Sequence, residues 1–332
     1  LVSNRAKLRL LREPWVRAMA NNSDESLVAF LQRRLGSEAG RLGATLMAHG
    51  VFAGDPERLS ARAAFPALVA LGDETGSVVR GGLAKRRARQ QSKSRARVHV
   101  ATNGMASLAG ELAEYLGDGF RSNWAVDTIR RRGESWVVKG VGEETAPAVV
   151  VALAPAAAAR LAPQPLMALL GEPVAAPVAV VGLGGSSADL PLPLGFGALI
   201  GPDSDVRALG LLFESSYAPG RAADSRRLLK CIYGGAADPE VLELNDEQLV
   251  KLTIEEVGRV VGVVPQPTWT RVIRHAPGIP QYNLGHLAWL ERLDEAMTGF
   301  PGFHLAGWGY RGIGVTSLAQ DATRVADKVM GS

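Results

Sequence analysis

The residues best suited to chemistry in this sequence form a glycine-rich stretch near its C-terminal end. Glycine occupies four of the eight positions 307–314, which follow the apolar segment 303–306. Glycines allow tight turns and let the backbone approach a flat ligand closely. Apolar residues then recur at helical spacing, and this helix is expected to begin at Thr316 or Ser317, with Ser317 and Gln320 as a capping box. A helix N-terminus carries partial positive charge, so the stretch suits a phosphate or an electron-rich ring, although a glycine turn without a ligand has the same pattern.

The other polar residues show no spacing typical of a catalytic or metal site. The five histidines are scattered, and Cys231 is the single cysteine among 332 residues. No Ser-His-Asp or zinc-ligand pattern results, so we expect no metal and no catalytic side chain. The lack of a catalytic pattern agrees with a protein in which a bound cofactor carries out the chemistry. One cysteine also excludes an internal disulfide and suits a reducing compartment.

Composition indicates a folded chain with a large core and two or more domains. Hydrophobic residues make up 47% of the chain, charged residues make up 21%, and the net charge is +4. Much of the basic excess lies in the run 85–97, which has no interleaved aromatic residues. We expect this run to be a solvated loop, and we expect no nucleic acid as a partner.

The pattern of apolar residues changes along the chain. Residues 1–84 show helical spacing, whereas the apolar run 149–153 is typical of a strand buried on both faces. Residues 182–188 resemble a phosphate loop, but prolines follow them instead of a helix, so we expect a turn there. The region after residue 161 has an α+β pattern, with a helix from Asp246 capped by Asn245. Its candidate strands are residues 174–181, 208–215, 227–233 and 267–275.

Two blocks are more specific than these patterns. Ile279–His286 (IPQYNLGH), followed by the glycine stretch, resembles the C-terminal signature of oxygen-dependent protoporphyrinogen oxidases. These are FAD enzymes of heme synthesis and members of the flavin-containing amine oxidase superfamily. Gly50–Asp55 (GVFAGD), with Leu59-Ser60 and Phe65-Pro66 after it, resembles the central motif of the same family. The blocks occur in the family's order and cover nearly the whole chain.

The resemblance implies an α/β plus α+β fold. A Rossmann-like FAD-binding domain would be built from the discontinuous segments 98–160 and 283–332. A mixed-sheet substrate-binding domain would span 161–282, and a helical, substrate- and membrane-facing domain would span 1–84, with the basic loop 85–97 after it. The family's N-terminal strand, glycine turn and helix, which hold the FAD pyrophosphate, do not precede Leu1, so the sequence is expected to be a fragment without that segment.

The resemblance also implies an activity. Protoporphyrinogen IX would be oxidised to protoporphyrin IX in three two-electron steps, with FAD as cofactor and oxygen as the acceptor that becomes hydrogen peroxide. Oxidation of coproporphyrinogen III to coproporphyrin III is an enzymatic alternative, and a flavin-free porphyrin-binding scaffold is a non-enzymatic one. The expected location is cytoplasmic, with peripheral contact to the cytoplasmic face of the inner membrane. The oligomeric state is not determined by the sequence, and a homodimer is one alternative.

Two groups of residues correspond to the family's ligand contacts. Those expected to contact FAD are Val126, Trp308, Ile313, Gly314 and Val315. Those expected to line the porphyrinogen cavity are Met47, Gly50, Phe196, Gly197, Leu199 and Ile232. Aromatic and aliphatic walls with interspersed glycines suit a flat, apolar ring. Without the resemblance, each of the cavity residues would be interpreted as part of the core.

Overall fold

The structure is a computed structural model that describes residues 2–16, 24–91, 100–101, 104–218 and 220–331. The chain folds into two compact units, each made of two segments. Unit 1 contains residues 1–117 and 176–279, and unit 2 contains residues 118–175 and 280–332. Segments that are distant in sequence therefore build each unit.

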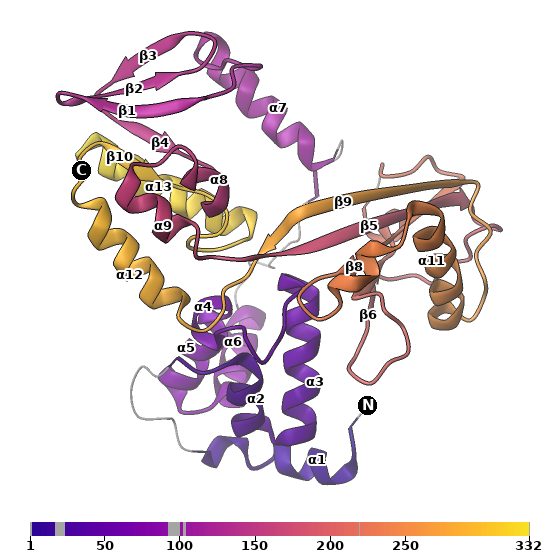
Figure 1. Cartoon of the computed structure of the whole chain (residues 1–332). Coiled ribbons are helices and arrows are strands. Elements are labelled where there is room, and N and C mark those ends of the chain that lie inside the picture. Colours follow the sequence, from indigo (N-terminus) through magenta and orange to yellow (C-terminus); the bar gives the residue numbers. More distant parts are fainter. Residues whose placement is uncertain (1, 17–23, 92–99, 102–103, 219, 332) are drawn as a thin grey trace. The chain divides into compact units, whose positions relative to one another are not determined.

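The first segment of unit 1 is helical (Figure 1). Serine hydroxyls begin two of its helices: Ser26 accepts from the Ala29 N–H at 3.3 Å, and Ser60 accepts from the Ala63 N–H at 3.0 Å. The bounds are α1 Asn4–Leu10, η1 Glu13–Trp15, α2 Leu27–Leu35, α3 Ser37–Met47, the π-helix η2 Ala48–Phe52, α4 Ala61–Ala64, α5 Pro66–Thr75, α6 Val78–Gln91 and α7 Met105–Leu116.

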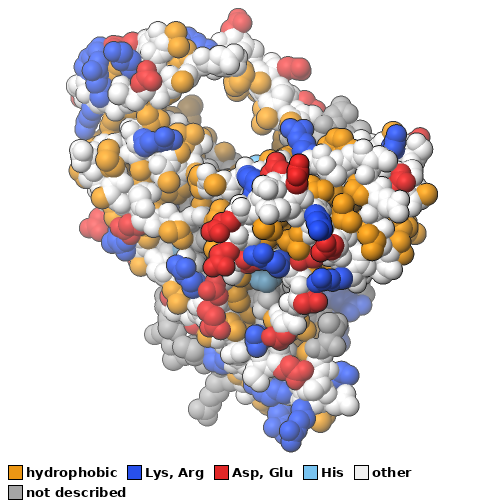
Figure 2. Space-filling view, turned by 45° about the vertical axis from the view of Figure 1, so that its right-hand side comes forward, with side chains coloured by type: hydrophobic (Ala, Val, Ile, Leu, Met, Phe, Trp, Pro, Cys, Tyr) orange, Lys and Arg blue, Asp and Glu red, His pale blue; other side chains and the backbone are white. Residues whose placement is uncertain are grey.

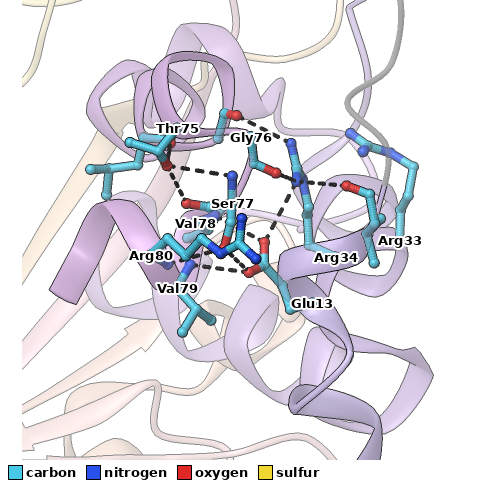
Figure 3. A network of polar contacts seen from close by, with 12 residues as sticks. Glu13, Arg33, Arg34, Thr75, Gly76, Ser77, Val78, Val79 and Arg80 are labelled. Atoms are coloured by element: carbon cyan, nitrogen blue, oxygen red, sulfur yellow. Dashed lines mark hydrogen bonds and ion pairs between the residues drawn. The ribbon is translucent and has the colours of Figure 1, made fainter. Parts of the chain in front are cut away.

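A buried polar network joins three of these helical pieces (Figure 3). Glu13 is fully buried, and its carboxylate accepts from the backbone N–H groups of Val78 at 2.9 Å and Val79 at 3.2 Å, at the start of α6. Arg34 of α2 is 1% exposed, and its Nη1 lies 3.6 Å from Glu13 Oε1 and 2.8 Å from the Gly76 oxygen. Burial lowers the pKa of Arg34, and the charge of Glu13 opposes this effect. Each buried charge thus has a partner, as a buried ion pair requires.

The second segment of unit 1 is a five-stranded sheet with the strand order β6-β7-β8-β5-β9 (Figure 1). Helix α11 (Asp246–Val261) covers one face, where Leu229 and Cys231 of β8 share a core cluster with Leu249 and Val257 of the helix. Since side chains alternate along a strand, the residues between them point to the opposite face. The other bounds are β5 Ala175–Ser186, β6 Gly197–Leu199, β7 Gly210–Leu212, α10 Glu214–Tyr217, β8 Arg226–Gly234, η4 Pro239–Glu243 and β9 Trp269–Pro280.

Unit 2 contains a parallel strand pair, an antiparallel meander and helices. Strand β4 (Val149–Val151) pairs in parallel with β10 (Phe303–Leu305). Trp136 of the meander donates through Nε1 to the Pro301 oxygen at 2.9 Å and packs on the Phe303 ring, so meander and strand pair share one core. The remaining bounds are η3 Gly117–Gly119, β1 Thr128–Arg132, β2 Ser135–Lys139, β3 Glu143–Ala146, α8 Pro155–Ala159, α9 Gln164–Leu170, α12 His286–Met297 and α13 Val315–Met330.

The structure confirms one expected helix and contradicts part of the expected basic loop. The helix at Asp246 is confirmed, with Asn245 as N-cap in a capping box. The expected loop at 85–97 is wrong for residues 85–91, which continue α6 because arginine, lysine, alanine and glutamine favour helix. The rest of that run, residues 92–97, lies outside the described residues.

One expected turn and two expected strands also need correction. The expected turn at 182–188 is wrong up to Ser186, because β5 continues that far and the Trp269 ring covers Gly182 and Gly184. The strand expected at 149–153 ends at Val151, and Val150 is 43% exposed, so burial on both faces is wrong. The strand expected at 208–215 is limited to Gly210–Leu212, because α10 begins at Glu214.

The surface is mixed in charge. Figure 2 shows acidic and basic side chains intermixed over one face, in agreement with the small net charge of +4. Among the described residues, no helix has the length and hydropathy that a membrane span needs.

Candidate functional site

The glycine stretch connects β10 to α13. Helix α13 begins at Val315, with Gly314 at its N-cap and no side-chain cap, so the capping box expected at Ser317 and Gln320 is wrong. Ser317 instead packs against Gly312, where an added Cβ would lie 2.3 Å from the Ser317 Cβ and the φ angle is 141°. The first turn of α13 therefore has no side chain that competes with a ligand for its N–H groups.

Buried side chains restrain both ends of the glycine stretch. Asp321 of α13 is 5% exposed, accepts from the Gly307 N–H at 3.1 Å and pairs with Arg324 at 2.7 Å. The Tyr282 hydroxyl accepts from the Gly312 N–H at 2.7 Å. These bonds fix the backbone of the stretch before any ligand arrives, which lowers the entropy cost of binding.

Residues 280–286, the part of the IPQYNLGH block that belongs to unit 2, support the same stretch. The rings of Tyr282 and His286 stack with centroids 4.0 Å apart, and His286 Nε2 lies 2.9 Å from the Tyr310 oxygen. Burial raises the pKa of Tyr282 to about 12, so its hydroxyl stays protonated at neutral pH.

Sequence reasoning assigned no role to Asp321 or Tyr282. Tyr282 was visible as part of the IPQYNLGH block, but its partner lies 30 residues away. Asp321 could have been recognised from its position, because it lies between Leu318 and Val325 on the apolar side of a helix. A charged side chain in such a position needs a buried partner.

The residues expected to contact FAD all lie in unit 2. Trp308, Ile313, Gly314 and Val315 belong to the glycine stretch and the start of α13, and Trp308 and Val315 are 39% and 54% exposed. Val126 is half-buried in the segment that leads into β1, so it belongs to the meander sheet and not to the β4–β10 pair. Four of the five thus lie within the eight residues 308–315.

The residues expected to line the porphyrinogen cavity all lie in unit 1. Leu199 of β6 reaches the π-helix η2, because a Cβ added at Gly50 would lie 3.3 Å from Leu199 Cδ1. Leu199 is also paired in register with Gly210, which in turn pairs with Ile232 of β8. Strand register therefore aligns Leu199 with Ile232 across Gly210, and Gly50 of η2 lies against Leu199.

Phe196 and Gly197 extend this row into an apolar wall. Phe196 is 62% exposed, and its ring stacks on Tyr217 with centroids 4.8 Å apart. Gly197 cannot be replaced without a shift, because an added Cβ would lie 1.9 Å from the Leu211 oxygen. Met47, the last residue of α3, is half-buried and leads directly into η2. We call the surface formed by Gly50, Phe196, Gly197, Leu199 and Ile232 the apolar wall.

The π-helix η2 is attached to the sheet through its backbone. Ala53 follows η2 with a φ angle of 46°, and its oxygen accepts from the Ala236 N–H at 2.8 Å. A Cβ added at Gly235 would lie 2.3 Å from that oxygen, so only glycine allows this approach. Short π-helices inside α-helices often mark functional positions, and this one borders the apolar wall.

One titratable group lies in η2. His49 Nδ1 is buried and has no hydrogen-bond partner among the described residues. Burial lowers the pKa of His49, so its ring is neutral at pH 7. A neutral imidazole is compatible with the neighbouring apolar wall. Within the described ranges, no three His, Cys, Asp or Glu side chains are grouped so that they could hold a metal ion.

The chain matches a protein family over almost its whole length. The sequence profile of flavin-containing amine oxidoreductases matches residues 3–330. The coproporphyrinogen III oxidase of Bacillus subtilis is 25% identical over 339 residues, which cover 98% of this chain and 72% of that protein. The human protoporphyrinogen oxidase is 28% identical over 360 residues, with the same coverage of 98% and 72%. A solved structure from Exiguobacterium sp. superposes with a TM-score of 0.79 at 20% identity, over 100% of this chain and 73% of that one. The chain therefore belongs to the family of flavin-containing amine oxidoreductases.

Proposed function

We propose that this protein oxidises a porphyrinogen to the corresponding porphyrin, with oxygen as electron acceptor. The observation that carries the proposal is the apolar wall of unit 1, on which Phe196 and Leu199 are exposed by 62% and 53%. Exposed aromatic and aliphatic side chains beside glycines suit a large, apolar macrocycle. Two similar proteins are named for oxidation of such rings, one of coproporphyrinogen III and one of protoporphyrinogen.

FAD is the cofactor of this family, and the glycine stretch of unit 2 fits its ring. Trp308, Ile313, Gly314 and Val315 would hold the ring, which, when bound, takes electrons in pairs from the substrate and passes them to oxygen. The uncapped first turn of α13 would stabilise negative charge on the reduced ring. Asp321 and Tyr282 keep the stretch in place through Gly307 and Gly312.

The substrate that we propose first is protoporphyrinogen IX, and coproporphyrinogen III is the second candidate. Each oxidation removes six hydrogen atoms in three two-electron steps, and three molecules of oxygen become three of hydrogen peroxide. The test is to purify this chain and the longest reading frame that contains it, and to measure flavin content by absorbance. Porphyrin fluorescence is then followed in air after addition of either porphyrinogen.

The expected result is bound FAD, formation of one porphyrin and release of peroxide. Flavin without oxidation of either porphyrinogen would contradict the proposed substrate class. Tight binding of a porphyrin by a protein free of flavin would instead support the scaffold alternative.

We also propose that the helical segment 1–84 contacts a membrane surface peripherally. In and after α1, Leu8, Leu11 and Trp15 are 65%, 68% and 75% exposed, and basic residues stand between them. Apolar side chains interleaved with arginine and lysine are typical of segments that lie at a membrane interface. The cytoplasmic face of the inner membrane is the proposed place, and the buried single Cys231 suits its reducing environment.

Vesicle binding tests this part of the proposal. The wild-type chain should sediment with vesicles of phosphatidylglycerol, and L8S, L11S and W15S together should abolish this. Equal sedimentation of the wild type and the triple variant would contradict membrane contact through α1.

A further inference from the structure

The sheet face that carries the apolar wall continues toward a group of arginines. Ile232, Leu228 and Arg226 lie on the same face of β8, because side chains alternate along a strand. Ile232 comes six positions after Arg226, which corresponds to about 20 Å at a rise of about 3.3 Å per residue. The apolar wall and Arg226 are therefore the two ends of one surface inside unit 1.

A pocket of about 410 Å³ lies at the arginine end of this surface. Its lining includes Arg221, Arg226, Arg227, Gly184, Thr268 and Trp269. We call it the arginine pocket.

The guanidinium groups of the arginine pocket lack acidic partners. No ion pair joins Arg221, Arg226 or Arg227 to another residue in the part of the chain that the structure describes. Among the described residues, Arg226 Nη1 donates to a hydroxyl, Thr268 Oγ1, at 3.4 Å. Arg221 Nε is buried and has no hydrogen-bond partner among the described residues. A buried donor without an acceptor costs stability, so an anion in this pocket would remove that cost.

Two carboxylates of the neighbouring segments have partners outside the pocket. Glu214 pairs with Lys230 at 3.0 Å, and Asp189 accepts from the Ser186 N–H at 2.9 Å. The charge of Arg226 acts on Asp189, but the two groups do not form an ion pair. The lining of the pocket contains three arginines and no acidic side chain.

One wall of the arginine pocket is flat and apolar. The Trp269 ring lies over Gly184, where an added Cβ would be 3.0 Å from Trp269 Cε3. Trp269 is still 48% exposed, so part of the ring is free for contact. An anion attached to an apolar body fits this combination of guanidinium and indole groups better than a free inorganic ion does.

We propose that the arginine pocket binds the carboxylate arms of a tetrapyrrole whose ring lies against the apolar wall. This inference rests on the proposed function and deepens it, because the pocket then selects substrates by their number of carboxylates. Arginine binds carboxylates through two parallel hydrogen bonds, and a porphyrinogen with four carboxylates offers more such contacts than one with two. The pocket thus favours the more highly carboxylated porphyrinogens.

The test measures binding of three stable porphyrins by their fluorescence: coproporphyrin III with four carboxylates, protoporphyrin IX with two, and protoporphyrin IX dimethyl ester with none. R221Q and R226Q should each weaken binding of the two acids by about tenfold and leave binding of the ester unchanged. R226K keeps the positive charge but loses the planar guanidinium that forms two parallel hydrogen bonds. Its affinity for the two acids should therefore lie between that of R226Q and that of the wild type. R259Q is the matched control, because Arg259 is an exposed arginine of unit 1 outside the pocket.

The outcomes separate this inference from the proposed function. Equal affinity for acids and ester, or equal behaviour of R226Q and R259Q, would overturn the arginine pocket while porphyrin binding stands. If none of the three porphyrins binds, the proposed function fails and the carboxylate assignment fails with it. If inorganic phosphate binds to the wild type, is lost in R226Q and displaces no porphyrin, the pocket is a phosphate site and the inference is wrong.

Discussion

Two arginine sites of unit 1 differ in what surrounds the guanidinium groups. Arg34 is 1% exposed and has acceptors on several sides, including the Glu13 carboxylate and the oxygens of Gly72 and Gly76 (Figure 3). Arg226 lies in an open pocket and reaches a single hydroxyl. The first site has its counter-charge within the chain, although Arg34 Nε is buried without a hydrogen-bond partner among the described residues. We propose that the second site takes its counter-charge from a bound anion. A counter-charge from the chain itself, present for Arg34 and absent for Arg226 among the described residues, thus separates the structural site from the proposed binding site.

The glycine stretch of unit 2 shows the same contrast within a few residues. The N–H groups of Gly307 and Gly312 are held by Asp321 and Tyr282. The first turn of α13 has no side-chain cap, and Val315 at its start is 54% exposed. The satisfied groups fix the backbone, and the unsatisfied groups are the ones left for a cofactor.

The largest effect is expected from breaking the completed arginine site. E13Q would leave the Arg34 charge buried without a counter-charge, and it should lower the free energy of unfolding by about 3–5 kcal/mol. Urea unfolding followed by circular dichroism measures this change. D203N is the matched control, because the Arg41–Asp203 pair is exposed and should contribute less than about 1 kcal/mol. If both variants lose the same stability, the network of Figure 3 is not the structural site that we describe.

A smaller effect is expected from Tyr282, whose hydroxyl holds the Gly312 N–H close to the uncapped first turn of α13. Y282F removes the acceptor of the Gly312 N–H, and it should cost about 1–2 kcal/mol of stability. Because the stretch would lose its restraint, the dissociation constant of FAD should rise as well. Equilibrium dialysis with FAD measures the second change. Y115F is the control, since Tyr115 is 89% exposed, and equal FAD affinity in both variants would contradict a positioning role for Tyr282.

Elements with a local signal were predictable from the sequence. Asn245 and Asp246 indicate the start of α11. The apolar segment 303–306, followed by glycines, indicates β10 and the connection to α13. The continuation of β5 through Gly182 and Gly184 was not predictable, because these residues pair with β8 and lie under the Trp269 ring of β9, and both partners come from distant parts of the sequence.

The candidate site was predictable only in part, for a similar reason. The family resemblance names Gly50, Leu199 and Ile232, but strand register aligns Leu199 with Ile232 and tertiary packing brings Gly50 against Leu199. The arginine pocket combines residues of β5, β8 and β9 with Arg221, so no spacing along the chain announces it. Partners of this kind are set by tertiary packing, whereas caps and glycine turns are set by neighbours in sequence.

The smallest expected effect concerns an unsatisfied group beside the apolar wall. Burial lowers the pKa of His49, so the unfolded chain, in which histidine has a pKa of about 6.5, takes up a proton more readily than the folded one. The stability linked to the neutral ring is therefore present above about pH 6.5 and is lost as the pH falls below it. H49Q removes this titration, so its advantage over the wild type should grow between pH 7 and pH 5, by less than about 1 kcal/mol because solvent screens the group. Urea unfolding at each pH measures the difference, with H275Q, a change at an exposed position of β9, as control. Parallel pH profiles for the wild type and H49Q would mean that the ring accepts a proton without cost, and that this side of the apolar wall is open to water.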